Sequence, residues 1–210
     1  TKFMIVSNPD RHLICFGTET TIGTTSTQDP MFIRWSDQDD FNSWTASATN
    51  SAGSQRVTGG SKIVTAVSTR GQILFLTDTS AHGMSFIGAP FTFGFQKLGT
   101  NCGAVSPHCA VDISGIIYWM SSDGFYMFDG TVRKMPCSVE DFVFDNIDTT
   151  QLEQVYAGSN SAFGEVIWFY CSTASNQIDR YVIFNYQEKL WYTGSLDRST
   201  WIDSGTYPLP

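Results

Sequence analysis

The strongest constraint on the fold of this chain is a short apolar segment that recurs four times. The copies are Leu13–Phe16, Ile73–Leu76, Ile116–Trp119 and Val166–Phe169. A polar turn and a second aromatic-rich segment follow, as in Phe125–Phe128 after the third copy. The last two intervals match the roughly 40–50-residue period of propeller blades. We therefore predict an all-β, β-propeller-like fold of antiparallel blades, with about four blade-like units.

The turn residues between the expected strands support the same fold. Tight-turn dipeptides, such as Asp123-Gly124 and Asp129-Gly130, separate many of the runs and force antiparallel neighbours. Runs that are apolar at nearly every position should be buried on both faces, as when one blade packs on the next. The strands expected are Leu13–Phe16, Met31–Trp35, Ile63–Val67, Ile73–Thr77, His82–Ile87, Phe91–Leu98, Ala110–Ile113, Ile116–Met120, Phe125–Phe128, Glu165–Cys171, Arg180–Asn185 and Leu190–Thr193. The expected core residues are Ile117, Trp119, Phe125, Phe128, Ile167 and Phe169, with Ile117, Trp119 and Ile167 the firmest.

Two stretches depart from this pattern. The polar residues 45–60 lengthen the first interval and are interpreted as an inserted loop. Residues 138–155 lack alternation and predict a short helical bridge, with a capping box from Ser138 to Asp141 and a second helix start at Asp148. No linker divides residues 1–210, so we expect a single propeller-like domain. The ending 207–210 has no closing element, and we expect a piece, or the ordered part, of a longer chain.

Charge and cysteine content narrow the classes of function. The net charge is −8 and the pI is about 4.6, which disfavours a role in gripping nucleic-acid phosphates. Charged residues make up only 15% of the chain, so much of the surface is expected to meet other protein. The five cysteines are odd in number and irregularly spaced, which favours free buried thiols over a disulfide framework. We find no signal peptide and no apolar run of membrane-spanning length, and predict no membrane insertion.

The stretch Ile33–Trp44, IRWSDQDDFNSW, predicts a strand that ends at an acidic turn. Asp side chains bond nearby backbone N–H groups, so Asp39 or Asp40 should cap one helical turn that carries Phe41 and Trp44. Three carboxylates also suit calcium, but the glycine and distal glutamate of an EF-hand loop are missing. We favour turn capping.

Other chemistries have weaker signals. Cys102, His108 and Cys109 match no zinc-ligand spacing, and 59–62 matches only a fragment of a phosphate loop. There is no G-x-S-x-G motif of a serine hydrolase. Glycosidase chemistry stays an open alternative, because two carboxylates from distant blades could meet in one site. Trp44 and Trp201 are the tryptophans that could form sugar-stacking platforms. We predict no catalytic residues, no metal and no cofactor.

Three segments together resemble the tail nozzle, or hub, β-propeller proteins of short-tailed phages, some of them called packaged-DNA stabilisation proteins. The first is Ile33–Phe41 with Trp44, the second is 115–130, an apolar strand, S-x-D-G, an aromatic strand and D-G, and the third is 181–191. The resemblance covers roughly Met31 to Trp201. The structural signature residues are Arg34, Trp35, Ser36, Asp37, Asp39, Phe41, Trp44, Trp119, Asp123, Gly124, Asp129, Gly130 and Trp191.

The resemblance implies a virion protein without catalytic residues, made in the host cytoplasm. Nozzle proteins form sixfold rings beneath the portal and adaptor, so a homo-oligomer is expected, with adaptor and fibre proteins as neighbours and genomic DNA as passing cargo during ejection. Because the chain is acidic and DNA must pass, the lumen of such a ring should be acidic or neutral. Two rivals stay open: a carbohydrate-binding propeller, which needs exposed aromatics beside polar clusters, and a glycan-cleaving one, which needs two facing acids.

Overall fold

The computed structural model describes residues 1–8, 10–197 and 201–203, so the ending 207–210 lies outside the described residues. The chain divides into two compact units, residues 1–103 and residues 104–210, each with two sheets. Whether one propeller domain holds both units stays a prediction. No helix in the described part of the chain is long and apolar enough to cross a membrane.

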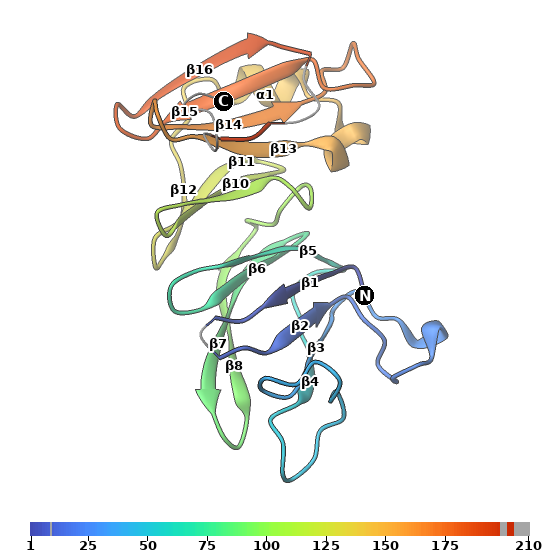
Figure 1. Ribbon diagram of the computed structural model, residues 1–210. Coiled ribbons are helices and arrows are strands. Elements are labelled where there is room, and N and C mark those ends of the chain that lie inside the picture. The colour runs from blue at the N-terminus through green and yellow to red at the C-terminus, as the bar shows by residue number, and fades with distance from the viewer. Residues whose placement is uncertain (9, 198–200, 204–210) are drawn as a thin grey trace. The chain divides into compact units, whose positions relative to one another are not determined.

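All the strands described belong to four antiparallel four-stranded sheets, each a meander in which neighbours in the sheet are neighbours in the chain (Figure 1). The first sheet contains β1 (Phe3–Val6), β2 (Leu13–Phe16), β3 (Phe32–Trp35) and β4 (Gly53–Arg56), and the second contains β5 (Ile63–Ser68), β6 (Ile73–Thr77), β7 (Ser80–Gly88) and β8 (Thr92–Thr100). The third contains β9 (Ala110–Ile113), β10 (Ile116–Ser121), β11 (Gly124–Phe128) and β12 (Val132–Lys134), and the fourth contains β13 (Tyr156–Asn160), β14 (Glu165–Tyr170), β15 (Arg180–Asn185) and β16 (Leu190–Ser195). The predicted all-β, blade-like fold is confirmed.

In the first unit, the two sheets share one apolar core. Phe16 of β2 meets Phe75 of β6 with ring centroids 5.9 Å apart, and Trp35 of β3 meets Phe93 of β8 at 5.3 Å, edge to face. Such aromatic pairs add to the stabilisation from apolar burial itself. The core therefore forms where the apolar strands of both sheets face each other.

In the second unit, aromatic side chains again join the sheets. Phe125 of β11 lies 4.8 Å from both Trp168 of β14 and Trp191 of β16, centroid to centroid. The indole N–H of Trp168 donates to the backbone oxygen of Cys109 at 3.0 Å, so its polar atom is satisfied in the interior. The six predicted core residues are all buried, with Ile117, Trp119 and Phe125 fully inaccessible.

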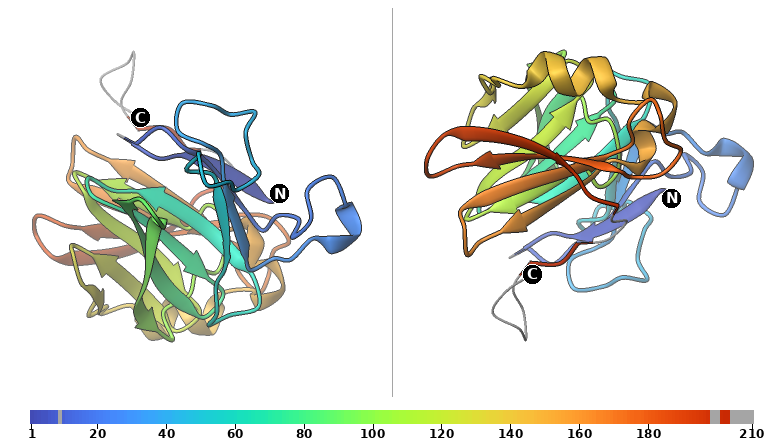
Figure 2. Two further views of the ribbon diagram at one scale, coloured as in Figure 1. Left: turned by 90° about the horizontal axis from the view of Figure 1, so that it is seen from below. Right: turned by 90° about the horizontal axis from the view of Figure 1, so that it is seen from above.

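The predicted helical bridge contains α1 (Glu140–Asn146) and the 3₁₀ helix η2 (Thr149–Gln154). Asp148 caps η2 as predicted, accepting from the Thr150 N–H at 2.8 Å. The Ser138 capping box is wrong, because α1 begins later and its N-cap is Val139, which offers no side-chain acceptor. Phe144 attaches α1 to β11 through Phe125, at 5.6 Å between ring centroids. The right-hand view of Figure 2 shows the ribbon of α1 in gold. A second 3₁₀ turn, η1 (Thr25–Thr27), lies between β2 and β3.

The inserted-loop prediction for residues 45–60 needs correction. Strand β4 lies within this range and pairs with β3, placing Gly53 opposite Trp35. A Cβ on Gly53 would lie 2.5 Å from the Trp35 indole, so the missing side chain lets the ring lie across the neighbouring strand. Aromatic cover compensates for the weak β-propensity of a polar, glycine-containing strand.

The same arrangement occurs on two edge strands of the second unit. The indole of Trp201 covers Gly158 of β13 and donates to the Ser159 oxygen at 2.8 Å, and the Tyr181 ring covers Gly194 of β16. Covered glycines are thus a recurring way of packing the sheet edges in this chain.

Candidate functional site

The predicted corner after Trp35 is held by two side chains that follow it. Ser36 is buried, and its hydroxyl accepts from the Leu13 N–H at 3.0 Å, linking β3 to β2. Asp37 Oδ1 accepts three hydrogen bonds, from the Ser51 hydroxyl at 2.6 Å, the Ser51 N–H at 2.8 Å and the Gln38 N–H at 2.9 Å. These donors, the Ser51 hydroxyl foremost, lower the pKa of Asp37, which is therefore ionised at neutral pH.

The helical turn expected after this corner is wrong. Asp37 and Asp40 instead pair across a tight turn, and Asp39 takes a left-handed conformation with φ of 58°. The Asp40 carboxylate accepts from the Asn42 N–H at 2.9 Å, an Asx turn that competes with helix formation. Asp39 forms an exposed ion pair with Arg11 at 2.9 Å. The Phe41 ring is exposed, and the Trp44 indole N–H donates to the Phe41 oxygen at 2.7 Å.

Arg34 and Trp35 hold the loops on either side of β3. Arg34 Nη2 donates to the backbone oxygens of Glu19 and Thr20 at 3.1 and 3.0 Å, which secures the β2–β3 connection. The Trp35 indole N–H donates to the Ser51 oxygen at 2.9 Å. Ser51 is thus bonded to both Trp35 and Asp37, and it fixes the end of the loop that returns to β4.

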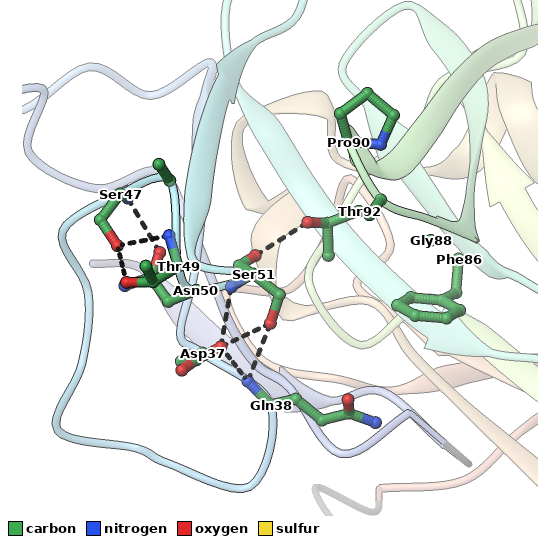
Figure 3. A pocket seen from close by; sticks show the side chains of 12 residues that line it. Asp37, Gln38, Ser47, Thr49, Asn50, Ser51, Phe86, Gly88, Pro90 and Thr92 are labelled. Carbon is green, nitrogen blue, oxygen red and sulfur yellow. Dashed lines mark hydrogen bonds between the residues drawn. The ribbon is translucent and has the colours of Figure 1, made fainter.

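A pocket of about 700 Å³ lies beside this corner, within the first unit (Figure 3). One wall is formed by Asp37, Gln38 and residues 47–51, and the other by Phe86, residues 88–90 and Thr92 of the β7–β8 hairpin. The Thr92 hydroxyl joins the walls by donating to the Ser51 oxygen at 2.9 Å. The volume is in the range of small-molecule sites.

The hairpin wall is held from behind. Phe86 is 40% exposed, and its ring lies 5.8 Å from the rings of both His12 and Phe93, centroid to centroid. Thr92 is buried with φ of 62°, a conformation that a β-branched residue rarely adopts. Strained backbone of this kind persists only where the surrounding structure enforces it, and it is enriched at binding sites.

The other signature residues lie in the second unit and hold turns and core contacts. Trp119 is fully buried and stacks on Tyr126 at 5.8 Å, and the Tyr126 hydroxyl donates to the Asp123 carboxylate at 3.1 Å. Asp129 pairs with Arg133, and this contact lowers the pKa of its carboxyl. The Trp191 indole donates to the Pro136 oxygen at 2.9 Å. Gly124 and Gly130 have φ of 147° and 115° at the two β-turns. The signature residues are therefore divided between the two units.

Two other chemical candidates find no support among the described residues. No group of three or more His, Cys, Asp or Glu side chains there could hold a metal ion, the acidic corner and Cys102, His108 and Cys109 included. Ser80 Oγ lies 2.8 Å from His82 Nε2, as a nucleophile and base would, but both residues are buried and neither lines the pockets described. Burial also lowers the pKa of His82, which favours the neutral imidazole.

The sequence did not single out the residues that form the pocket walls, apart from Asp37. Ser51 and Thr92 are 41 residues apart, and only the packing of the hairpin against the loop brings them together. The one signal for them in the sequence was the run 80–95, which contains four phenylalanines and no Asp, Glu, Lys or Arg. This run extends beyond the expected strand His82–Ile87. A comparison with protein-family models found no match, and a search of curated proteins found none either.

Proposed function

We propose that this chain is a structural virion protein of a phage tail, a nozzle or hub subunit that forms part of the conduit for DNA. The observation that carries the proposal is the corner Arg34–Asp37. Its side chains bond to backbone atoms of their own unit and to Ser51, and of the four residues Asp37 alone also lines the neighbouring pocket. Signature residues that mainly hold turns, loops and core contacts are what a building module requires.

The blade-like sheets and the pocket chemistry support a non-catalytic role over the glycan-cleaving rival. Paired-carboxylate hydrolysis needs two acids and a raised pKa on one of them. Asp37 is the one carboxylate among the described residues that line the 700 Å³ pocket, and its pKa is lowered. An ionised lone carboxylate is poorly suited to donate a proton to a leaving group.

In the proposed assembly, copies of the chain form a ring, sixfold by resemblance, that contacts adaptor and fibre proteins. A conduit that lets DNA pass must not grip its phosphates, because each Lys or Arg contact adds affinity through counterion release. A chain with 12 basic and 20 acidic residues suits this requirement. We expect the ring lumen to be acidic or neutral, with the basic residues mainly at subunit contacts.

The test is cryo-electron microscopy of the particle, combined with labelling by antibodies raised against the recombinant chain. The expected result is label on the tail and density for a ring with an axial pore. A chain absent from the particle, or a monomer at the outer edge of the tail, would contradict the proposal. A pore lined chiefly by Lys and Arg would contradict the expectation for the lumen.

A further inference from the structure

The pocket between the 36–52 loop and the β7–β8 hairpin offers one aromatic wall and one polar wall. We propose that it binds a neutral saccharide, with the sugar ring stacked on Phe86 and its hydroxyls bonded to the polar wall. The proposal is independent of the assignment to a phage tail, since it depends only on the geometry of the first unit.

The aromatic wall is suited to the apolar face of a sugar ring. Phe86 packs against His12 and Phe93, is partly exposed and lines the pocket. A ring fixed in this way loses little conformational entropy when a ligand stacks on it. Pro90 adds a second rigid apolar surface on the same wall.

The polar wall retains hydrogen-bonding groups for a ligand. Asp37 Oδ1 is occupied by Ser51 and Gln38, whereas Oδ2 accepts no hydrogen bond from the described residues. The Gln38 side chain is exposed and extended in Figure 3, and its carboxamide bonds to none of the residues drawn there. A carboxylate oxygen and a carboxamide together accept from and donate to neighbouring hydroxyls.

The charge of the lining selects among ligand classes. None of the described lining residues is Lys, Arg or His, so phosphates and carboxylates have no cation to bind, and ionised Asp37 repels them. The lining is also too polar for a purely apolar ligand, with hydroxyls from Ser47, Thr49 and Ser51. A neutral ring with several hydroxyl groups is complementary to both walls, the aromatic one and the polar one.

The two walls are preorganised, so a ligand can bind without a large rearrangement. Thr92 bonds the hairpin to Ser51, and Ser51 is bonded in turn to Asp37. The Asn50 carboxamide braces the loop through the Ser47 N–H at 2.9 Å and the Thr45 oxygen at 2.9 Å. Preorganisation of this kind reduces the entropy cost of association.

The test is saturation-transfer NMR and isothermal titration calorimetry on the full chain. The probes are glucose, galactose, N-acetylglucosamine and rhamnose, together with short oligomers of each. The expected result is saturable binding of at least one sugar, with a dissociation constant on the order of millimolar for a single ring. Inorganic phosphate should not compete with that sugar.

Variants distinguish binding in this pocket from non-specific binding elsewhere on the protein. Phe86→Ala should weaken binding of the sugar about tenfold or more, and Gln38→Ala about threefold or more. Phe86→Trp keeps an aromatic ring at this position and should retain binding. Phe91→Ala is the matched control, because Phe91 lies on the same hairpin, is more exposed and does not line the pocket. Far-UV circular dichroism checks that each variant is folded, and the Gln38 variant keeps the test valid if a Phe86 variant fails to fold. The proposal is overturned if no probe saturates up to about 50 mM, or if Phe86→Ala binds as the wild type does.

Discussion

At the scale of single residues, the corner after β3 shows why a half-buried aspartate can matter to the fold. Asp37 is an acceptor for three donors from Gln38 and Ser51, and the loop 38–50 is closed by those bonds. The sequence indicated that a polar cluster would end the strand here. It did not show that the partner would be Ser51, because that contact spans a long loop.

Replacing Asp37 with Asn should lower the melting temperature at pH 7, because the amide loses charge-assisted acceptance from Ser51. The folded-state pKa of Asp37 is lowered, so the stabilisation is present above the unfolded pKa of about 4 and is lost as the pH falls through the folded value. Thermal melts from pH 7 to pH 2 should show the two proteins converging in acid. Asp145→Asn, at an exposed position on α1, is the control and should leave the melting temperature nearly unchanged. A constant difference down to the lowest pH would contradict this role of the charge.

The cysteines should be poorly reactive in the native protein. Cys15, Cys102, Cys109 and Cys171 are buried, and burial raises the pKa of the partly exposed Cys137 to about 11. Because the thiolate is the reactive form, labelling with a disulfide reagent at about pH 8 should be slow. Five thiols should react quickly in denaturant. Rapid modification of two or more thiols in the folded chain would show that the interior is more open than described.

Core packing in the second unit gives a sharper expectation. Trp119 is fully buried, so Trp119→Ala should lower the free energy of unfolding by about 3–5 kcal/mol. Urea unfolding followed by circular dichroism measures the change. Leu190→Ala is the control, since Leu190 is half exposed, and should alter stability by no more than about 0.5 kcal/mol. Equal losses for both substitutions would contradict the packing of β10.

At the scale of elements, the strands that the sequence revealed and those it concealed differ in their position. All twelve expected strands exist, and they include both central strands of every sheet. The missed strands β1, β4, β12 and β13 are all edges, and the first three contain no buried residue. A strand such as Gly53–Arg56 has no apolar pattern of its own, and it forms because β3 offers unpaired backbone groups and Trp35 covers it.

Because β4 depends on cover by Trp35, two glycine substitutions should lower the stability of the first unit by unequal amounts. Gly53→Ala should destabilise the first unit by about 1–3 kcal/mol, because the new Cβ would overlap the Trp35 indole. Gly71→Ala has open space around it and should change stability by no more than about 0.5 kcal/mol. Chemical denaturation of both variants makes the comparison. A smaller cost of Gly53→Ala in a Trp35→Leu background would locate the clash, whereas an unchanged cost would exclude it.

At the scale of the whole molecule, apolar exposure is the notable property of an otherwise acidic chain. Thirteen large hydrophobic side chains among the described residues are exposed, and they occur in both units. Exposed apolar side chains mark a partner site where they form one contiguous patch. Under the proposed function, part of this surface would be buried between subunits.

Sedimentation of the purified chain at about 10–100 µM should therefore reveal species heavier than the 23.3 kDa monomer. The association should persist at high salt, because apolar contacts are not screened as charge pairs are. A chain that stays monomeric across this range would count against self-assembly through these surfaces, and dissociation by salt would point to ion pairs instead.

The meander order of every sheet has a consequence for synthesis. Each sheet is complete as soon as its fourth strand has emerged from the ribosome, because no strand waits for a distant partner. The first sheet, however, buries Ile14, Phe16 and Ile33 against the second, whose last strand ends at Thr100. At roughly 5–20 residues per second, the nascent chain therefore displays an uncovered apolar sheet face for a few seconds after β4 appears. Ribosome-bound chains whose emerged part ends between residues 56 and 100 should accordingly be those that chaperones bind most strongly.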